Sequence, residues 1–282
     1  LIQSPFLTTW RPSPSTKTQL RTLSPMSDVV VIGGEGFLGS GIVEVLGAAS
    51  LGRSQDADIQ ANILLHEDLG ALQDYDVVIN CVGLSPLFEP KTPYKAIHVN
   101  AVKNILHVLD DDQHYVHISA IGADPGAPNT YLRTKGRGEA VIRETHDFHT
   151  ILRPDVMYDA SSETWRERVL QPFRFGVMPN ISKKSRAVHR GDVVDAVSHV
   201  VDNGVTGSYN LYGDEAVTLT DMVRRIGGQR VLTIPEFVWY PFFFAACEAR
   251  LFNLSRDQRV LYKYEFNYGD RPDWFTPSVI PE

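Results

Sequence analysis

A tyrosine and a lysine stand four residues apart in this chain, and a serine lies twelve positions before the tyrosine. They are Tyr131, Lys135 and Ser119, and the serine closes an apolar run of strand length, residues 115–119. Residues i and i+4 share one face of a helix, so the phenol and the ammonium can point into one pocket. A phenol with an ordinary pKa of about 10 exchanges protons poorly at neutral pH unless a nearby cation favours the phenolate. The three residues therefore form a candidate proton-transfer site.

A glycine-rich turn lies near the start of the chain, between an apolar run and a helical pattern. Residues 29–32 are consecutive Val and Ile residues, and Gly33, Gly36 and Gly39 follow with the spacing G-x-x-G-x-x-G. Glycines at a first strand–helix junction let backbone N–H groups approach a pyrophosphate, which the helix N-terminus also attracts. Ser40 follows Gly39 where a nucleotide-hydrolase phosphate loop needs lysine, so that alternative is excluded. The turn predicts dinucleotide binding.

The elements that would position these groups follow an α/β pattern. Strand-like runs alternate with helix-like segments through the first 155 residues, as expected of βαβ units around a parallel sheet. The predicted strands are 29–33, 59–63, 76–82, 115–119 and 150–153, and the predicted helices are 37–46, 94–109 and 131–144. The fold class is therefore α/β, a Rossmann-like doubly wound parallel sheet. Outside such a sheet, the Tyr-Lys spacing would indicate only an amphipathic helix with an exposed lysine.

The pattern loosens after residue 155. Helices are predicted at 193–201 and 218–226, and strands at 209–211 and 231–234. We expect a disordered leader (1–27), a Rossmann domain (28–155), and a smaller C-terminal α/β lobe (156–282) interleaved with the same fold. The leader is rich in Ser, Thr and Pro and has no acid, so an organelle-targeting peptide is the weaker alternative to a disordered or upstream-encoded segment.

Composition excludes several classes of protein. A hydrophobic fraction of 43% with 22% charged residues is typical of a globular protein rather than a disordered one. The net charge of -7 disfavours nucleic acid as a partner. A local basic cluster is interpreted as a solvated loop: Lys183, Lys184, Arg186 and Arg190. With only Cys81 and Cys247, the chain has no disulfide framework and no cysteine metal pattern, and we expect no metal.

An aromatic segment, residues 237–252, comes nearest to a membrane span. Pro241, Glu248 and Arg250 interrupt it, and it is shorter than the roughly 18 residues that a span needs. We interpret it first as a buried amphipathic helix and second as a docking face for a membrane complex or a membrane surface. The expected compartment is the cytoplasm, with the mitochondrial matrix or a membrane periphery as alternatives.

The glycine spacing, Ser119 and Tyr131-x-x-x-Lys135 together resemble the short-chain dehydrogenase/reductase superfamily, in its extended or atypical branch with NAD-dependent epimerase/dehydratase-like and NmrA-like proteins. Residues 131–139, Tyr-Leu-Arg-Thr-Lys-Gly-Arg-Gly-Glu, are more narrowly similar to the group that contains the nucleotide-binding accessory subunit of respiratory complex I. The string 119–125 supports the same group. The resemblance covers roughly residues 28–235.

The resemblance implies a cofactor site and its residues. The implied cofactor-binding residues are Gly33, Gly36, Phe37, Leu38, Gly39, Arg53, Asn62, Ile63, Gly83, Tyr131, Lys135 and Pro154. The three glycines of the turn would hold the pyrophosphate, Asn62 and Ile63 would edge the adenine, and Gly83 would line the floor of the cofactor site. Arg53 would bind a ribose 2′-phosphate, which favours NADP(H), with NAD(H) as the alternative.

The same resemblance implies a reaction. Tyr131 would be the general acid or base, Lys135 would bind the nicotinamide ribose and lower the pKa of the tyrosine, and Ser119 would hold the oxygen of a carbonyl or quinone-like substrate. The first interpretation is an NADPH-linked oxidoreductase. The alternatives are a non-catalytic NADPH-binding accessory or sensor subunit of a respiratory or quinone-related complex, and a nucleotide-sugar epimerase or dehydratase.

The sequence departs from the family pattern in two places. The stretch from Gly39 to Arg53 is short for a helix, a turn and a second strand, so we expect that strand to be truncated or absent and Arg53 to be a 2′-phosphate ligand or a surface arginine. Asp155 and Asp159 replace a serine and a turn glycine that follow the family's Arg-Pro pair. These acids near an anionic ligand need a neutralising cation, for which Arg153 and Arg190 are the candidates.

Overall fold

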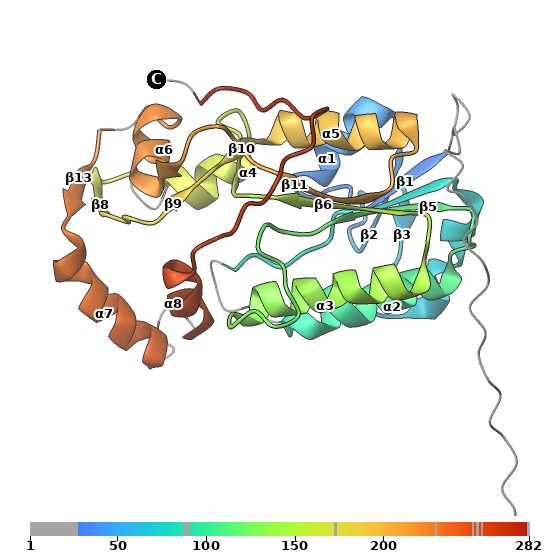
Figure 1. Ribbon diagram of the computed structural model, residues 1–282, viewed down its shortest axis with the longest axis horizontal. Coiled ribbons are helices and arrows are strands. Elements are labelled where there is room, and N and C mark those ends of the chain that lie inside the picture. The colour runs from blue at the N-terminus through green and yellow to red at the C-terminus, as the bar shows by residue number, and fades with distance from the viewer. Residues whose placement is uncertain are drawn as a thin grey trace, which may run out of the picture.

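A seven-stranded parallel sheet forms the centre of the molecule, with the strand order β11-β6-β5-β4-β1-β2-β3 (Figure 1). The computed structural model describes residues 28–86, 90, 92–171, 174–228, 230–249, 251, 254 and 256–280, so the predicted leader lies outside the described residues. The strands are Val29–Ile32 (β1), Ala49–Gly52 (β2), Ile59–Gln60 (β3), Val77–Asn80 (β4), His114–Ile118 (β5), His149–Pro154 (β6) and Gly207–Leu211 (β11). The order reverses between β1 and β4, and doubly wound sheets bind ligands at that switch point.

Helices cover both faces of the sheet, which confirms the predicted Rossmann-like fold. On one face lie α1 (Gly39–Leu46) and α5 (Arg190–Asn203). On the other lie a 3₁₀ helix η1 (His66–Asp74), a π-helical turn η2 (Ala96–Asn100), α2 (Ala101–Val108) and α3 (Thr130–Thr145). The carboxyl ends of β1, β4 and β5 therefore open at one edge between these two helical layers.

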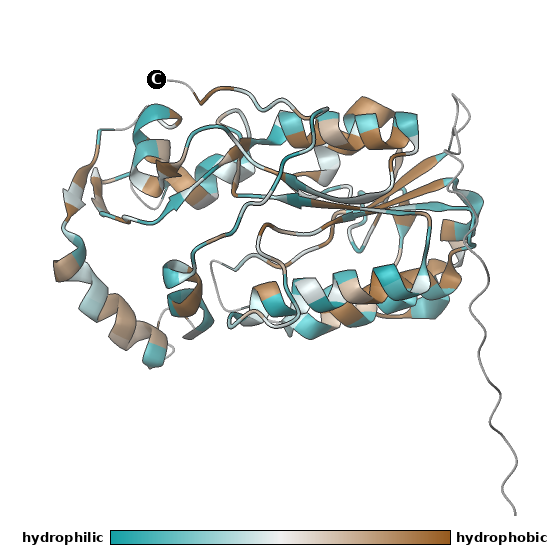
Figure 2. Cartoon of the chain, in the orientation of Figure 1, coloured by the Kyte–Doolittle hydropathy of each residue, from teal (hydrophilic) through white to brown (hydrophobic). Residues whose placement is uncertain are grey.

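The sheet has an apolar cluster on each face, which explains why the central strands consist of unbroken runs of hydrophobic residues. Val31 faces the cluster that α1 and α5 complete, whereas Val30 and Ile32 face the cluster under α2 and α3. All three side chains are fully buried, because a central parallel strand is covered on both faces. Figure 2 shows this hydrophobic colouring concentrated in the strands and on the sheet-facing sides of the helices.

The second half of the chain builds a smaller lobe beside the carboxyl edge. Its elements are β7 (Met157–Tyr158), α4 (Glu163–Trp165), a π-helical turn η3 (Arg166–Leu170), β8 (Val177–Pro179), β9 (Lys184–Ser185), β10 (Val188–His189), β12 (Val217–Thr218), α6 (Leu219–Arg225), β13 (Leu232–Ile234), α7 (Glu236–Glu248) and α8 (Arg256–Lys263). Tyr158, Trp165 and Met222 belong to its own apolar cluster, and Phe37 of the glycine turn packs against it. The lobe is interleaved with the main sheet, since α5 and β11 come from this half.

The second strand of the Rossmann unit is present, so the expectation that it is truncated or absent is wrong. Helix α1 is only eight residues long and ends in a left-handed cap at Gly47, φ 60°. The strand β2 then begins at Ala49 and pairs in parallel with β1. Its small residues Ala49 and Ser50 gave no strand-like pattern in the sequence. Arg53 follows β2 directly and is exposed at the carboxyl edge.

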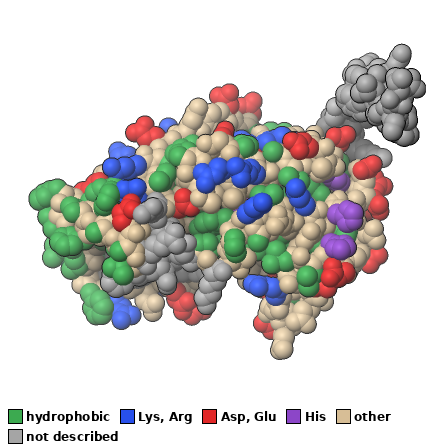
Figure 3. Space-filling model, turned by 90° about the horizontal axis from the view of Figure 1, so that it is seen from below, with side chains coloured by type: hydrophobic (Ala, Val, Ile, Leu, Met, Phe, Trp, Pro, Cys, Tyr) green, Lys and Arg blue, Asp and Glu red, His purple; other side chains and the backbone are tan. Residues whose placement is uncertain are grey.

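The aromatic segment forms α7, and the prediction that this helix is buried is wrong. Phe237 is 81% exposed and Phe242 is 75% exposed, while Cys247 is the one residue of the helix that is buried. Apolar residues occur all around α7 rather than along one stripe, so packing one face of the helix cannot bury all of them. Figure 3 shows hydrophobic side chains gathered at one end of the molecule. Among the described residues, no helix combines the length and hydropathy needed to cross a membrane.

Candidate dinucleotide and proton-transfer site

The glycine turn after β1 is too tight for side chains at Gly33, Gly34 and Gly39. Gly33 has φ +80°, a left-handed conformation that favours glycine, and a Cβ there would lie 2.9 Å from Val82 Cγ2. A Cβ on Gly39 would lie 2.2 Å from the Gly33 carbonyl oxygen. Gly36 N–H donates to that carbonyl oxygen over 3.0 Å. The turn leads straight into α1, so its backbone amides fit an anionic pyrophosphate.

Two charged side chains lie at the end of β2, where the adenosine ribose of a Rossmann ligand sits. Arg53 is exposed there. Glu35 comes from the glycine turn, and its Oε2 would be 2.3 Å from a Cβ on Gly52. The carboxylate therefore rests against the last residue of the strand. Sequence reasoning missed Glu35, although an acid inside the glycine turn was a visible signal.

The predicted adenine residues follow β3. Asn62 Oδ1 accepts a hydrogen bond from the backbone N–H of Leu64 over 3.1 Å, which holds a turn. Ile63 is buried in the cluster beneath α2, and its carbonyl oxygen accepts from Asn104 Nδ2 over 3.1 Å. Asn62 is part-exposed at this turn, while the Ile63 side chain belongs to the core.

Lys135 extends from α3 to the carboxyl ends of β4 and β5. Its Nζ donates to the carbonyl oxygen of Ile118, the last residue of β5, over 2.9 Å. A Cβ on Gly83, after β4, would lie 3.3 Å from the same Nζ. Asn129 caps the helix by accepting from Leu132 N–H. Burial lowers the pKa of Lys135 to about 8, although the Glu139 carboxylate opposes that shift.

Tyr131 is half-buried among aromatic rings one turn before Lys135. Its ring centroid lies 5.7 Å from that of Tyr94 and 5.5 Å from that of His98, both in edge-on geometry. Burial raises the pKa of Tyr131 above its ordinary value, and Tyr94 adds to the shift. The phenol is thus protonated at neutral pH, so it can donate a proton but is a poor base.

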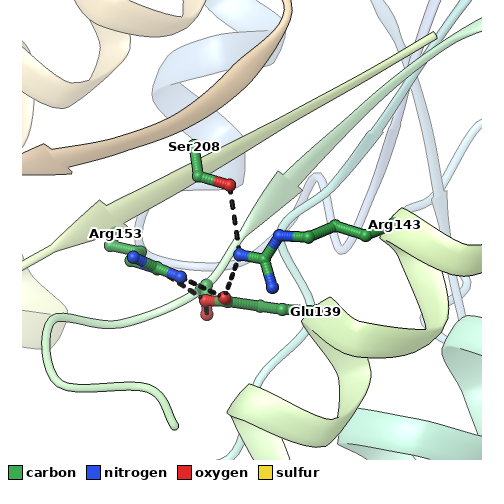
Figure 4. A network of polar contacts seen from close by, with 5 residues as sticks. Glu139, Arg143, Arg153 and Ser208 are labelled. Atoms are coloured by element: carbon green, nitrogen blue, oxygen red, sulfur yellow. Dashed lines mark hydrogen bonds and ion pairs between the residues drawn. The ribbon is translucent and has the colours of Figure 1, made fainter. Parts of the chain in front are cut away.

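Ser119 is bound to a buried carboxylate that the sequence did not assign to the site. Its Oγ donates to Glu139 Oε1 over 2.6 Å. Arg153 also binds Glu139 through Nε, at 2.8 Å, and Nη2, while Arg143 Nη2 contacts Oε2 at 2.7 Å and Ser208 Oγ at 3.1 Å (Figure 4). A carboxylate only accepts, so the single hydroxyl proton of Ser119 is used by Glu139. The sequence contained a sign of this contact, because Glu139 lies one helical turn after Lys135 and so on the same face of α3.

The two acids after β6 have separate partners. Asp155 accepts from Tyr268 Oη and from the Arg186 backbone N–H, each over 2.7 Å, and burial raises the pKa of its carboxyl. Asp159 pairs with Arg190 Nη1 at 3.2 Å. Of the two candidate cations, Arg190 neutralises Asp159 and Arg153 serves Glu139 instead. Pro154 is buried, and its carbonyl oxygen accepts from Ile121 N–H over 3.1 Å.

The fold is that of a Rossmann protein, and the glycine turn with Ser119, Tyr131 and Lys135 resembles the site of extended short-chain dehydrogenases/reductases. Its similarity to solved structures agrees: a dTDP-4-dehydrorhamnose reductase from Bacillus anthracis in complex with NADP has a TM-score of 0.64 at 13% identity, covering 84% of this chain and 98% of that one. A UDP-glucose 4-epimerase from Thermus thermophilus in complex with NAD has a TM-score of 0.59 at 19% identity, covering 74% and 86%. At these identities the likeness shows the fold alone.

Three curated proteins are similar to this chain in sequence, two of them subunits of a respiratory complex. The chain is 27% identical over 182 residues to the mitochondrial NADH-ubiquinone oxidoreductase 40 kDa subunit of Neurospora crassa, covering 59% of this chain and 46% of that protein. It is 25% identical to the mitochondrial NADH dehydrogenase [ubiquinone] 1 alpha subcomplex subunit 9 of Dictyostelium discoideum, covering 55% and 45%. A probable low-salt glycan biosynthesis reductase of Haloferax volcanii is 25% identical, covering 70% and 78%.

These relatives confirm the resemblance drawn from the sequence. The chain spans about half the length of the two respiratory relatives. No family model matches the sequence.

Proposed function

We propose that this chain binds a nicotinamide dinucleotide at the carboxyl edge between β1 and β4, with NADP(H) favoured over NAD(H). The observation that carries the proposal is the closure of the glycine turn, where Gly39 approaches the Gly33 carbonyl oxygen so closely that only glycine fits. Lys135 and Gly83 border the same edge, where a nicotinamide ribose would lie. Arg53 supports NADP(H), because its guanidinium is exposed at the end of β2.

The chemistry we propose is reversible reduction of a carbonyl or quinone-like substrate, with hydride supplied or accepted by the nicotinamide when bound. Tyr131 donates the proton to the substrate oxygen, which its raised pKa favours by keeping the phenol protonated. Lys135 binds ribose hydroxyls through its Nζ, which the Ile118 carbonyl oxygen holds at the carboxyl end of β5. Ser119 can donate a hydrogen bond to the substrate oxygen only after its hydroxyl rotates away from Glu139.

Mass spectrometry of the nucleotide that copurifies with the protein tests the binding proposal. Turnover of that complex is then assayed with carbonyls, quinones and nucleotide sugars, the last because an epimerase or dehydratase is the third candidate. Tyr131→Phe should lower turnover at least about 100-fold while leaving nucleotide affinity within about twofold, since it removes only the proton donor. Undiminished turnover by this variant would contradict the role of Tyr131.

The second candidate is a nucleotide-binding subunit without turnover, in which NADPH is a structural ligand or redox gauge. The bond from Ser119 to Glu139 favours it, because the serine has no proton left for a substrate oxygen. The respiratory relatives are named as subunits of a larger complex, and the exposed α7 offers a docking face for such an assembly. Bound NADPH that stays unoxidised with every carbonyl and quinone supplied would support this candidate over the first.

A further inference from the structure

Arg190 reaches the glycine turn from the second half of the chain. It is the first residue of α5, which packs along α1. A Cβ on Gly41 would lie 2.8 Å from Arg190 Nη2, so α1 leaves a gap in which the guanidinium fits. The same Nη2 donates to Ser40 Oγ over 2.9 Å. The guanidinium therefore lies against the first turn of α1, beside the proposed pyrophosphate site.

The side chain is held from both sides. Asp159 accepts from Nη1 through Oδ2, and Ser161 N–H anchors the other carboxylate oxygen over 2.9 Å. The Arg190 Cζ lies 5.4 Å from the centroid of the Phe37 ring. The arginine side chain is 19% exposed and that of Asp159 is 7% exposed, so the prediction that Arg190 belongs to a solvated loop is wrong.

One donor of this guanidinium is unused. Arg190 Nε is buried and has no hydrogen-bond partner among the described residues. An unsatisfied buried donor on a charged group is unfavourable, so a site that leaves one in place invites an acceptor. Asp159 is not that acceptor. Although burial opposes its ionisation, hydrogen bonds from Ser161 and Arg190 hold the pKa of Asp159 below its usual value, so it stays a fixed anion opposite the arginine.

We propose that Arg190 is a cofactor-binding residue whose guanidinium binds the pyrophosphate of the dinucleotide. The inference rests on the proposed function and adds a phosphate ligand from outside the glycine turn. Backbone amides and a helix N-terminus supply only partial positive charge, whereas a guanidinium offers a full charge and paired donors that match phosphate oxygens. Ser40 exchanges its bond with Nη2 for the phosphate, while Asp159 keeps the arginine aimed and neutralised in the free protein.

Binding of two ligands to an Arg190→Gln variant tests the proposal. NADP⁺ contains the pyrophosphate, whereas adenosine 2′-monophosphate shares its adenosine and 2′-phosphate but lacks it. We expect the Kd for NADP⁺ to rise about 10- to 100-fold and the Kd for adenosine 2′-monophosphate to stay within about twofold, as measured by calorimetry. Arg271→Gln is the matched control: its side chain is 25% exposed and pairs with Asp214, and its loss should leave both Kd values unchanged.

The experiment distinguishes failure of the proposed function from failure of the proposed role of Arg190. If the wild-type chain binds no dinucleotide, the proposed function itself is overturned. If it binds NADP⁺ and Arg190→Gln keeps that affinity, or loses both ligands equally, only the role of Arg190 is overturned.

Asp159→Asn gives a second measurement in case Arg190→Gln fails to fold, as judged by circular dichroism. This variant keeps the arginine and removes its competing charge, so NADP⁺ should bind about threefold more tightly. A Kd at least tenfold weaker would overturn the proposal.

Discussion

Glu139 is the residue on which the polar chemistry of this site depends. Its buried carboxylate accepts from Ser119, Arg143 and Arg153 at once, and Lys135 stands one helical turn away. A buried ion with several donors is stable only while all of them remain, because each unpaired charge would face a low dielectric. Glu139 therefore ties α3 to β5 and β6 and sets the direction of the serine hydroxyl.

Glu139→Gln should destabilise the protein by about 3 to 5 kcal/mol, because the arginines lose their buried anion. Urea unfolding monitored by circular dichroism measures the change. Glu215→Gln is the control: Glu215 pairs with Arg225 while half-exposed, so its loss should lower the free energy of unfolding far less. Equal effects of the two substitutions would contradict the importance of the buried network.

We expect the choice between NADP(H) and NAD(H) to depend on Arg53 and Glu35. The arginine would attract a ribose 2′-phosphate, whereas the Glu35 carboxylate against Gly52 would repel it and accept from a free 2′-hydroxyl. The two side chains thus oppose each other at one edge of the sheet.

Glu35→Gln should therefore shift the ratio of affinities toward NADP⁺ by about tenfold, since the repulsion is removed. Calorimetric titration with NADP⁺ and NAD⁺ gives the two Kd values. Glu44→Gln removes an exposed acid from α1 itself and should leave the ratio as it is. A ratio unaffected by Glu35→Gln would show that the carboxylate does not face the ribose.

At the scale of elements, α7 differs from the helices that cover the sheet. Helices α1, α2 and α3 each bury one side against the strands. The helix α7 instead exposes Phe237 and Phe242 and contains Pro241. Hydrophobic side chains gather at one end of the molecule (Figure 3), and an exposed patch of this kind is a candidate interaction surface.

Replacing Phe237 and Phe242 together by Ser should leave the free energy of unfolding within about 0.5 kcal/mol for each site, because neither ring is buried in the described chain. Binding of a hydrophobic dye such as ANS should fall at the same time. Trp165→Ser is the comparison, since this ring is 4% exposed in the lobe cluster and its loss should cost about 3 to 5 kcal/mol. A large loss of stability in the double variant would mean that α7 is packed in solution.

At the scale of the whole molecule, the two halves of the chain complete each other. The second half contributes β11 to the edge of the sheet and α5 to the face that covers α1. The first half contributes Phe37 to the cluster of the lobe. The proposed dinucleotide site therefore draws on both halves: the glycine turn comes from one, and Asp159 and Arg190 come from the other.

Local patterns in the sequence were enough to predict the Rossmann-like architecture and to select the residues of the candidate site. Alternating strand and helix signals predicted the parallel sheet, and Gly33, Gly36 and Gly39 marked its first turn. The four-residue spacing of Tyr131 and Lys135 placed the two side chains on α3. These features depend on neighbours a few residues away, which a sequence displays directly.

Contacts between distant parts of the chain determine which side chains are free to act. The hydrogen bond from Ser119 to Glu139 joins residues 20 positions apart, and the one from Arg190 to Ser40 joins residues 150 positions apart. No local pattern in the sequence could predict either bond. The same holds for burial: the structure buries the polar side chain of His146, with Nε2 2.8 Å from the Gln113 carbonyl oxygen. Hydropathy indicates whether a side chain favours burial, whereas packing against distant segments determines whether it is buried.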